Sequence, residues 1–327
     1  MKGLKRILCG IVAAGSIVAL IATTGAMAQE YPNRPIRFIV GFAAGGSSDV
    51  VARIVGQKIS EILGVGIPVE NRTGANGTLA MRQVAQAEPD GYTITIAGAT
   101  VMSISPHTTI NLGYDPVKDF IGVSTVSKSP IVIAANPSVK AKNLKELAEV
   151  AKSGSLTMGS SGVGGIAHLA IEMFNKATGA KTIHVPYTGG GPAANDVLAG
   201  HTHSLAMDLA PLRSHIEAGK MTAVAVVGAN RSIMLPDTPT AIEQGYPGMT
   251  ADNWYAIVVP AKTPKAVVDK LHAAVVQAAN APEVKEKLKA IGSEAISMAS
   301  PAEFPPFLQR ELDRWGEVVR AAGLEKK

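Results

Sequence analysis

The stretch IRFIVGFAAGGSSDVVARIV, residues 36–55, predicts the architecture of the chain. Its first residues, IRFIV, are rich in β-branched and aromatic types, which favours a short buried strand. Gly41, Gly45 and Gly46 then allow a sharp bend. Apolar residues recur at helical spacing over residues 50–63, so a helix follows the bend. The stretch is therefore a strand–loop–helix unit of the kind that builds α/β proteins.

The bend has the chemistry of an anion site. Ser47, Ser48 and Asp49 are residue types that cap helices, and the free N–H groups and dipole of a helix start favour negative charge. Asp49 argues against a highly charged phosphate, so a carboxylate, or a ligand that also offers a donor, fits better. The spacing matches neither a Walker A loop nor the GxGxxG fingerprint. The alternative is a structural turn in which Asp49 caps the helix or pairs with Arg53.

Two further loops repeat the pattern. MGSSGVGGIAHLA, residues 158–170, places Ser160 and Ser161 before a helix, and HVPYTGGGPAANDVLAG, residues 184–200, has Pro192 near a helix start. Ligands of open α/β sheets lie at the carboxyl ends of strands, where such loops occur. If two lobes present the three loops face to face, we expect them to grip both ends of a small anion.

Strand and helix patterns alternate along the rest of the chain, which predicts parallel sheets flanked by helices in two α/β lobes. The strands are expected at residues 36–40, 65–70, 93–97, 131–135, 156–158, 184–187, 205–207, 223–227 and 255–259. The helices are expected at residues 50–63, 78–87, 143–151, 166–178, 192–199, 264–280, 281–291 and 303–322, with Asn143 as a cap.

The N-terminus predicts export. Lys2, Lys5 and Arg6 precede an apolar stretch, residues 11–22, and Ala26-Met27-Ala28 is a small-x-small cleavage site. These features predict a signal peptide that is cleaved after Ala28, and a periplasmic protein. The apolar stretch is short for a membrane anchor, and a lipoprotein cysteine would follow the stretch rather than precede it.

Removal of the signal changes what the composition implies. The formal charge falls from +5 to +2, and no basic run with interleaved aromatics is present, so a nucleic-acid partner is not expected. The only cysteine, Cys9, leaves with the signal. The mature protein then has no disulfide, and its stability must come from its core.

The candidates for catalysis are few. Ser160 or Ser161 with His168 and Asp208 would suit a serine hydrolase, but there is no GxSxG elbow. His201 and His203 lack a third metal ligand nearby, so no metal or other cofactor is expected. Trp254 either stacks on a ligand or packs in the core, and Met102, Met158 and Met207 could line an apolar cleft or pack. Binding without chemistry is therefore expected.

Taken together, the motifs resemble the substrate-binding receptors of tripartite tricarboxylate transporters, also called Bug receptors or TctC-like periplasmic binding proteins. The segments that carry the resemblance are YPNRPIRFIVGFAAGGSSDVVARIV, VENRTGANGTLAMRQVAQAEPDGYTI, YDPVKDF, GVGGIAHLA, VPYTGGGPAANDVLAG, LPDTPTAIEQGYPG and NWYAIVVPAKTP. They follow the family's order and cover essentially all of the mature chain.

The resemblance implies a fold like that of type II periplasmic binding proteins, with two α/β lobes, a two-strand hinge and a ligand cleft between the lobes. After the signal peptide, residues 1–28, one lobe would comprise residues 29–124 and 228–327 and the other residues 125–227. The strands that cross between them are expected near residues 120–127 and 224–229.

The resemblance also implies that the first loop and its counterpart in the other lobe hold a ligand carboxylate, partly through waters. Carried over, the binding residues are Phe42, Ala43, Ala44, Ser47, Ser48, Asp49, Thr100, Ser160, Tyr187, Thr188, Gly189, Gly190, Ala193 and Asp208. The ligand would be a di- or tricarboxylate, an aromatic carboxylate or an acidic amino acid. The protein would be a monomer that delivers it to the integral-membrane permease subunits. A periplasmic sensor that presents its closed form to a membrane signalling protein would use the same binding chemistry.

The chain departs from the family pattern at a few loop positions. The family often has proline at the positions of Gly41 and Ala43, and glycine at those of Asn76, Ala80 and Ala256. The first loop should therefore be less rigid, and no proline ring should stand near the expected carboxylate.

Overall fold

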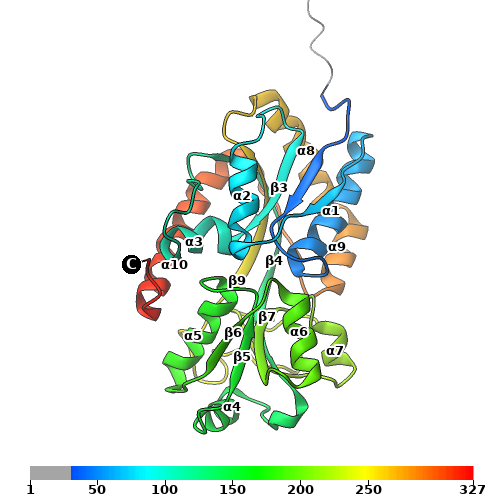
Figure 1. Ribbon diagram of the computed structural model, residues 1–327. Coiled ribbons are helices and arrows are strands. Elements are labelled where there is room, and N and C mark those ends of the chain that lie inside the picture. Colours follow the sequence, from blue (N-terminus) through cyan, green and yellow to red (C-terminus); the bar gives the residue numbers. More distant parts are fainter. Residues whose placement is uncertain (1–30, 327) are drawn as a thin grey trace, which may run out of the picture. The chain divides into compact units, whose positions relative to one another are not determined.

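The computed structural model describes residues 31–326, and the fold below is that of residues 34–326. The predicted signal peptide, residues 1–28, lies outside the described residues, so its cleavage after Ala28 stays a prediction. Strands and helices alternate over most of the chain, as the sequence predicts (Figure 1). Within the described part, no helix combines the length and the apolar character that a bilayer crossing needs.

The first lobe is built on a mixed sheet in the order β2-β1-β3-β9-β4. β1 is parallel to β2 and β3, whereas β9 is antiparallel to β3, so the sheet is not wholly parallel as expected. Its strands are β1 (Arg37–Val40), β2 (Val69–Asn71), β3 (Thr93–Gly98) and β9 (Asp252–Pro260). Its helices are α1 (Ser47–Leu63), η2 (Ala75–Gly77), α2 (Thr78–Ala85), η3 (Thr100–Ile104), α3 (Ser105–Thr108), α8 (Lys265–Asn280), α9 (Pro282–Ala290), η5 (Pro301–Glu303) and α10 (Phe304–Ala322).

The second lobe is drawn in green in the lower half of Figure 1. Its strands β6, β5 and β7 are parallel neighbours, and β7 and β8 both run antiparallel to β4. The strands are β5 (Thr157–Ser160), β6 (Ile183–Pro186), β7 (Ser204–Asp208) and β8 (Thr222–Val227). The helices are η4 (Pro137–Val139), α4 (Leu144–Ala151), α5 (Ile166–Thr178), α6 (Gly190–Ala199) and α7 (Arg213–Glu217).

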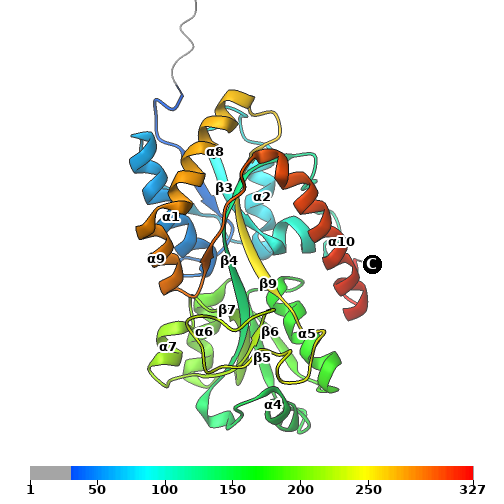
Figure 2. The same cartoon turned by 180° about the vertical axis from the view of Figure 1, so that it is seen from behind.

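One strand belongs to both lobes. β4 (Phe120–Ala135) pairs with β9 from Phe120 to Pro130, and with β7 and β8 over Ile131 to Ala135. The short strand β10 (Glu294–Ala295) also pairs with the first part of β4. The sequence predicts a strand only at residues 131–135 and a separate crossing at 120–127, and these prove to be one continuous strand. Figure 2, the view from behind, shows β4 passing from one half to the other beside β9.

The second crossing between the lobes is expected at β8. β8 pairs only with Ile131 to Ala135 of β4, so it lies within the second lobe rather than crossing at residues 224–229. The segment after it stays bonded there, because Ala241 N–H donates to Val226 O and Ala251 N–H donates to Val227 O (2.9 and 2.7 Å). The lobe limits 29–124, 125–227 and 228–327 stay a prediction, and these bonds favour assigning residues 228–251 to the second lobe.

Local signals set several element boundaries. α5 spans Ile166–Thr178, the range that the sequence predicts. Asn143 caps α4 as expected, because its side chain accepts a hydrogen bond from Glu146 N–H at 2.8 Å. Gly41 lies against the backbone of Gly77, where a Cβ atom would come within 2.9 Å of the Gly77 Cα. The close approach explains why glycine suits position 41 in this chain.

Gly122 on β4 provides a test of the packing between β4 and α10. A Cβ atom at this position would overlap the ring of Phe304, the first residue of α10. We expect Gly122→Ala to lower the free energy of unfolding by about 2 kcal/mol, because the buried ring must shift. Urea unfolding measures the change. Gly248→Ala is the control, since a Cβ atom there meets nothing within 4 Å, and equal losses in both variants would contradict the packing.

Candidate functional site

The three predicted strand–loop–helix units meet at one cavity. β1, β5 and β6 lead into α1, α5 and α6, whose first residues are Ser47, Ile166 and Gly190. All three line a cavity of about 40 Å³. α1 belongs to the first lobe and the other two helices belong to the second, so the cavity lies between the lobes. Its lining residues are Phe42, Gly46, Ser47, Ser48, Ile96, Gly98, Thr100, Val101, Ser161, Ile166, Gly190, Met207, Asp208, Asn253 and Tyr255.

The start of a helix carries partial positive charge, and its first N–H groups have no acceptor within the helix. Three such starts converge here, while none of the described lining residues is Lys, Arg or His. One of these N–H groups is already used across the lobes, since Ile166 N–H donates to Thr100 Oγ1 at 3.2 Å. The cavity can therefore accept a carboxylate on main-chain and hydroxyl donors without a cationic side chain.

A second cavity of about 410 Å³ lies next to the first, because Phe42 and Ser161 line both. Its other lining residues are Gly41, Gly74, Ala75, Asn76, Gly77, Pro186, Tyr187, Thr188 and Pro192. This space is large enough for the part of a ligand that extends beyond the group held by the helix starts.

Asp208, at the end of β7, has a buried network in the small cavity. Asn253 Nδ2 donates to both carboxylate oxygens of Asp208 (3.2 and 3.3 Å), and the Tyr255 hydroxyl donates to Oδ2 at 3.2 Å. Asn253 Nδ2 also donates to the Tyr255 hydroxyl at 2.9 Å. Burial raises the pKa of Asp208 to about 6, although these donors act in the opposite direction.

Asp49 holds the first loop together instead of facing the cavities. Its carboxylate accepts from Gly45 N–H (3.0 Å), Asn71 Nδ2 (2.9 Å) and the Arg53 guanidinium (3.0 Å). Burial would raise the pKa of Asp49, but these hydrogen bonds together outweigh it and lower the pKa below its usual value. Asn71 Nδ2 also donates to Phe42 O at 3.0 Å. Asp49 therefore pairs with Arg53, which is the structural role that the sequence analysis gives as the alternative to ligand binding.

Ser160 contacts a histidine that the sequence analysis does not consider for catalysis. Its Oγ lies 2.6 Å from His184 Nε2 and donates to Gly162 O at 3.0 Å. The His184 ring stacks on His168, with centroids 3.8 Å apart. His168 Nδ1 in turn accepts from Gly164 N–H at 3.0 Å, which fixes the second loop. Ser160, His168 and Asp208 therefore do not form a hydrolase triad, since Asp208 bonds to other partners.

Burial also affects the two stacked rings. It lowers the pKa of His168 to about 4, and it lowers the pKa of His184 to about 4 with help from the neighbouring His168. Both imidazoles are therefore neutral near pH 7, and their protonation would disturb the loop that carries Gly162 and Gly164.

The loops of the two lobes touch directly. A Cβ atom at Gly189 would lie 3.1 Å from Ala43 Cβ. Asn76 Nδ2 donates to Val163 O at 3.2 Å, and its side chain fills the space beside Gly162 and Gly165. The structure thus shows the lobes in a closed arrangement.

The predicted site residues separate into two groups. Those that line a cavity are Phe42, Ser47, Ser48, Thr100, Tyr187, Thr188, Gly190 and Asp208. Those that line neither are Ala43, Ala44, Asp49, Ser160, Gly189 and Ala193. Ala43 and Gly189 form the contact between loops, Asp49 and Ser160 brace their loops, and Ala193 is buried in the core of the second lobe. The direct role of both groups in binding stays a prediction.

Sequence reasoning missed Asn253 and Tyr255. Both lie on β9 and point to the cavity, whereas Trp254 between them packs on Phe304 and Phe307 and donates to Glu311. Side chains alternate between the two faces of a strand, so Asn253 and Tyr255 share one face and Trp254 lies on the other. This alternation was the signal in the sequence that could have grouped them. Trp254 therefore packs in the core. Met102 and Met158 are likewise buried in the core, and only Met207 of the three candidate methionines lines the cavity.

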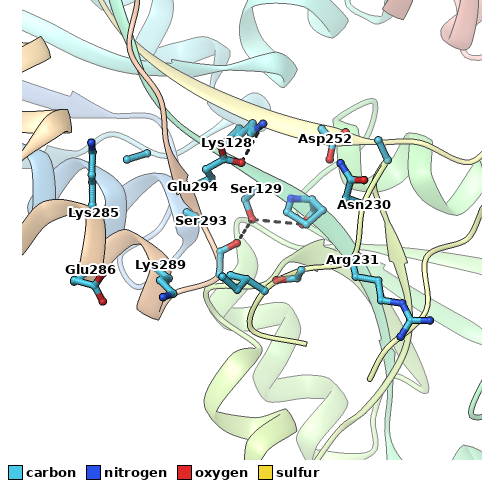
Figure 3. Close-up of a pocket in the computed structure, with 16 residues that line it drawn as sticks. Lys128, Ser129, Asn230, Arg231, Asp252, Lys285, Glu286, Lys289, Ser293 and Glu294 are labelled. Carbon is cyan, nitrogen blue, oxygen red and sulfur yellow. Dashed lines mark hydrogen bonds and ion pairs between the residues drawn. The ribbon is translucent and has the colours of Figure 1, made fainter. Parts of the chain in front are cut away.

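A separate pocket of about 580 Å³ shares no residue with the two cavities. Figure 3 shows Lys128 of β4 beside Glu294 of β10, with Lys285, Glu286 and Lys289 along α9. Lys128 forms an ion pair with Glu294 at 3.0 Å, and Arg231, also in the lining, pairs with Glu243 at 2.9 Å. The remaining charges have both signs, so this pocket has no clear ligand chemistry.

Comparison with known proteins assigns the family. The model of the tripartite tricarboxylate transporter family receptor matches residues 51–324. The chain belongs to this receptor family. It is similar to the protein BugT of Bordetella pertussis, with 32% identity over 94% of this chain and 96% of that protein.

Solved structures agree with the assignment. The periplasmic binding protein BugD has 36% identity and a TM-score of 0.87, over 91% of this chain and all of that one (100%). MatC from Rhodopseudomonas palustris with bound malate has 30% identity and a TM-score of 0.84, over 88% of this chain and 100% of that one. The chain is thus a solute-binding receptor of the tripartite tricarboxylate transporter family, with the periplasmic-binding-protein fold predicted from its motifs.

Asp208 should make the stability of this receptor fall with rising pH. An acid with a raised pKa in the folded state favours folding while it is protonated, and this contribution is lost as the pH rises from about 4 to about 6. Over this pH range we expect the free energy of unfolding of the wild type to fall by about 3 kcal/mol. Asp208→Asn should not show this fall, because its amide does not titrate. Urea unfolding of both proteins at about pH 4 and about pH 7.5 measures it. A difference between them that stays constant with pH would contradict the prediction.

The histidine pair should act in the opposite direction. A histidine whose pKa is lowered on folding stabilises the fold at high pH, and that stability is lost as the pH falls from about 6.5 to about 4. We expect His184→Gln to remove about 2 kcal/mol of this acid dependence, since the amide cannot titrate and the partial exposure of His184 reduces the effect. Unfolding curves across this range test it. The control is exposed His201→Gln, and a His184→Gln profile parallel to the wild type would refute the assignment.

Proposed function

We propose that this receptor captures a small carboxylate between its lobes and, acting as a monomer, delivers it to the membrane permease of a tripartite tricarboxylate-type transporter. The observation that carries the proposal is the convergence of the starts of α1, α5 and α6 on one cavity, in which no lining residue from the described part of the chain is Lys, Arg or His. No chemistry on the ligand is required.

Main-chain donors suit reversible capture. A buried Lys or Arg would cost free energy whenever the ligand leaves, because its charge would lose its partner. Helix starts provide partial charge at fixed positions and bear no such cost in the empty state. Bridging waters in the neighbouring 410 Å³ cavity would allow ligands of different length.

The position of the cavity links binding to closure. Ser47 and Ser48 lie in the first lobe, and Ser161 and Gly190 lie in the second. A ligand can contact both sets only when the lobes are closed, so it shifts the population towards the closed form. The permease would then recognise a form that is abundant only when ligand is bound.

The comparisons support two parts of the proposal. MatC, a similar protein, was solved with malate, a dicarboxylate. The matching family is described as a receptor of tripartite tricarboxylate transporters, which supports delivery to a membrane permease.

A thermal-shift screen of the mature protein against carboxylic acids and their amides tests the proposal. A ligand that binds only the folded state raises the melting temperature, and we expect a rise with an acid but not with its amide. A rise with amides, sugars or phosphates but no acid would refute carboxylate capture.

Gly190→Val should weaken binding of the identified acid more than tenfold. A Cβ atom at Gly190 would come within 3.0 Å of Pro211 Cγ and 3.2 Å of Met207 Sδ, which displaces the start of α6. Gly191→Ala is the matched control, because a Cβ atom there has its nearest contact at 3.7 Å. Calorimetric titration of both variants, after folding is verified, measures the difference. Equal affinities would place the binding site elsewhere.

A further inference from the structure

Among the described residues that line the small cavity, Asp208 has the one carboxyl group, and none is Lys, Arg or His. Asp208 is 7% exposed, and the residues that line the cavity with it are otherwise neutral. Its hydrogen-bond partners, Asn253 and Tyr255, are also neutral. A buried carboxylate without a cationic partner is costly, and that cost increases when the lobes close and exclude water.

The partners of Asp208 are arranged for its ionised form. Asn253 Nδ2 and the Tyr255 hydroxyl both point donors at the carboxylate. The Tyr255 hydroxyl could also accept from a protonated carboxyl group, but Asn253 Nδ2 can only donate, and it lies against both carboxylate oxygens. The amide of Asn253 therefore favours the ionised form of Asp208.

A second acceptor lies beside this charge. Asn253 is 5% exposed, and its Oδ1 finds no hydrogen-bond partner within residues 31–326. A buried carbonyl oxygen that lacks a donor is also costly, so a bound ligand is the natural source of that donor. A ligand group with several N–H bonds and a positive charge would therefore satisfy both Asp208 and Asn253.

The opposite requirement holds at the helix starts. Ser47, Ile166 and Gly190 begin α1, α5 and α6, whose N–H groups and dipoles favour an anion. The same cavity of about 40 Å³ is therefore lined both by donors that suit an anion and by acceptors that suit a cation. Its volume suits only the head of a ligand, and the adjoining cavity of about 410 Å³ has room for the rest.

We propose that the ligand is a zwitterion, an α-amino acid whose carboxylate lies on the helix starts and whose ammonium group donates to Asp208 and to Asn253 Oδ1. Its side chain extends into the cavity lined by Asn76, Tyr187 and Thr188. The inference rests on the proposed function and narrows its carboxylate to one that carries an amine. A hydroxy acid of the same shape leaves the Asp208 charge uncompensated, so the receptor discriminates against it.

Calorimetric titration with matched sets of compounds tests the inference. Each set holds an amino acid, its 2-hydroxy analogue and its deaminated analogue, for example aspartate, malate and succinate, or phenylalanine, phenyllactate and 3-phenylpropionate. We expect the amino acid of at least one set to bind at least tenfold more tightly than both analogues. Equal or tighter binding of the analogues overturns the inference while carboxylate capture stands. Binding of amino acid amides as tight as that of the acids overturns the carboxylate as well, and no binding by any compound overturns both.

Substitutions test whether Asp208 recognises the ammonium group of the ligand. Asp208→Asn keeps the shape and removes the charge, so we expect the preference for the amino acid over the hydroxy acid to fall at least tenfold. Tyr255→Phe removes a donor but leaves the charge, and it should keep the preference. Asp269→Asn on α8, which alters an exposed ion pair with Lys265, is the matched control for the loss of one carboxylate. An unchanged preference in Asp208→Asn, with folding verified by its melting temperature, overturns the inference.

Discussion

The main-chain hydrogen bonds of β4 are the constraint on which the rest of the receptor depends. Over Phe120–Pro130 the strand pairs with β9, and over Ile131–Ala135 it lies between β7 and β8. Neither sheet can be completed without it. Because one strand serves two sheets, the ends of β1, β5 and β6 are carried on a single framework, and the helices that follow them can meet at one cavity.

The chemistry of the cavity follows from what that framework supplies. Helix starts provide positive potential with no flexible side chain to order, so little conformational entropy is lost when an anion binds. The ends of β7 and β9 contribute the opposite sign through Asp208 and its neighbour Asn253. The charged side chains that hold the loops in place line neither cavity. Asp49, for example, is satisfied by Arg53, Gly45 and Asn71 and has no capacity left for a ligand.

Much of this arrangement can be predicted from the sequence, because the signals are local. Gly-rich bends between apolar strands and amphipathic helices mark all three loops, and the family motifs give their order. The long strand β4 was harder to predict, since residues 120–130 include Ser124, Ser127 and Lys128 among its apolar residues. Asn253 and Tyr255 were missed because alternation along β9 shows only that they share one face of the strand. That this face meets the cavity follows from the antiparallel pairing of β9 with β3 and β4. The role of Asp49 could not be chosen from sequence, since the same residue type suits a loop brace and a ligand contact.

The contact between Ala43 and Gly189 has a consequence for how affinity can be adjusted. These residues touch where the two loops meet, yet neither lines a cavity. The size of the side chains at this point limits how closely the two lobes can approach each other. Relatives with a bulkier residue at either position would close less far and retain their ligand for a shorter time. Residence time could thus diverge among receptors whose ligand contacts are identical.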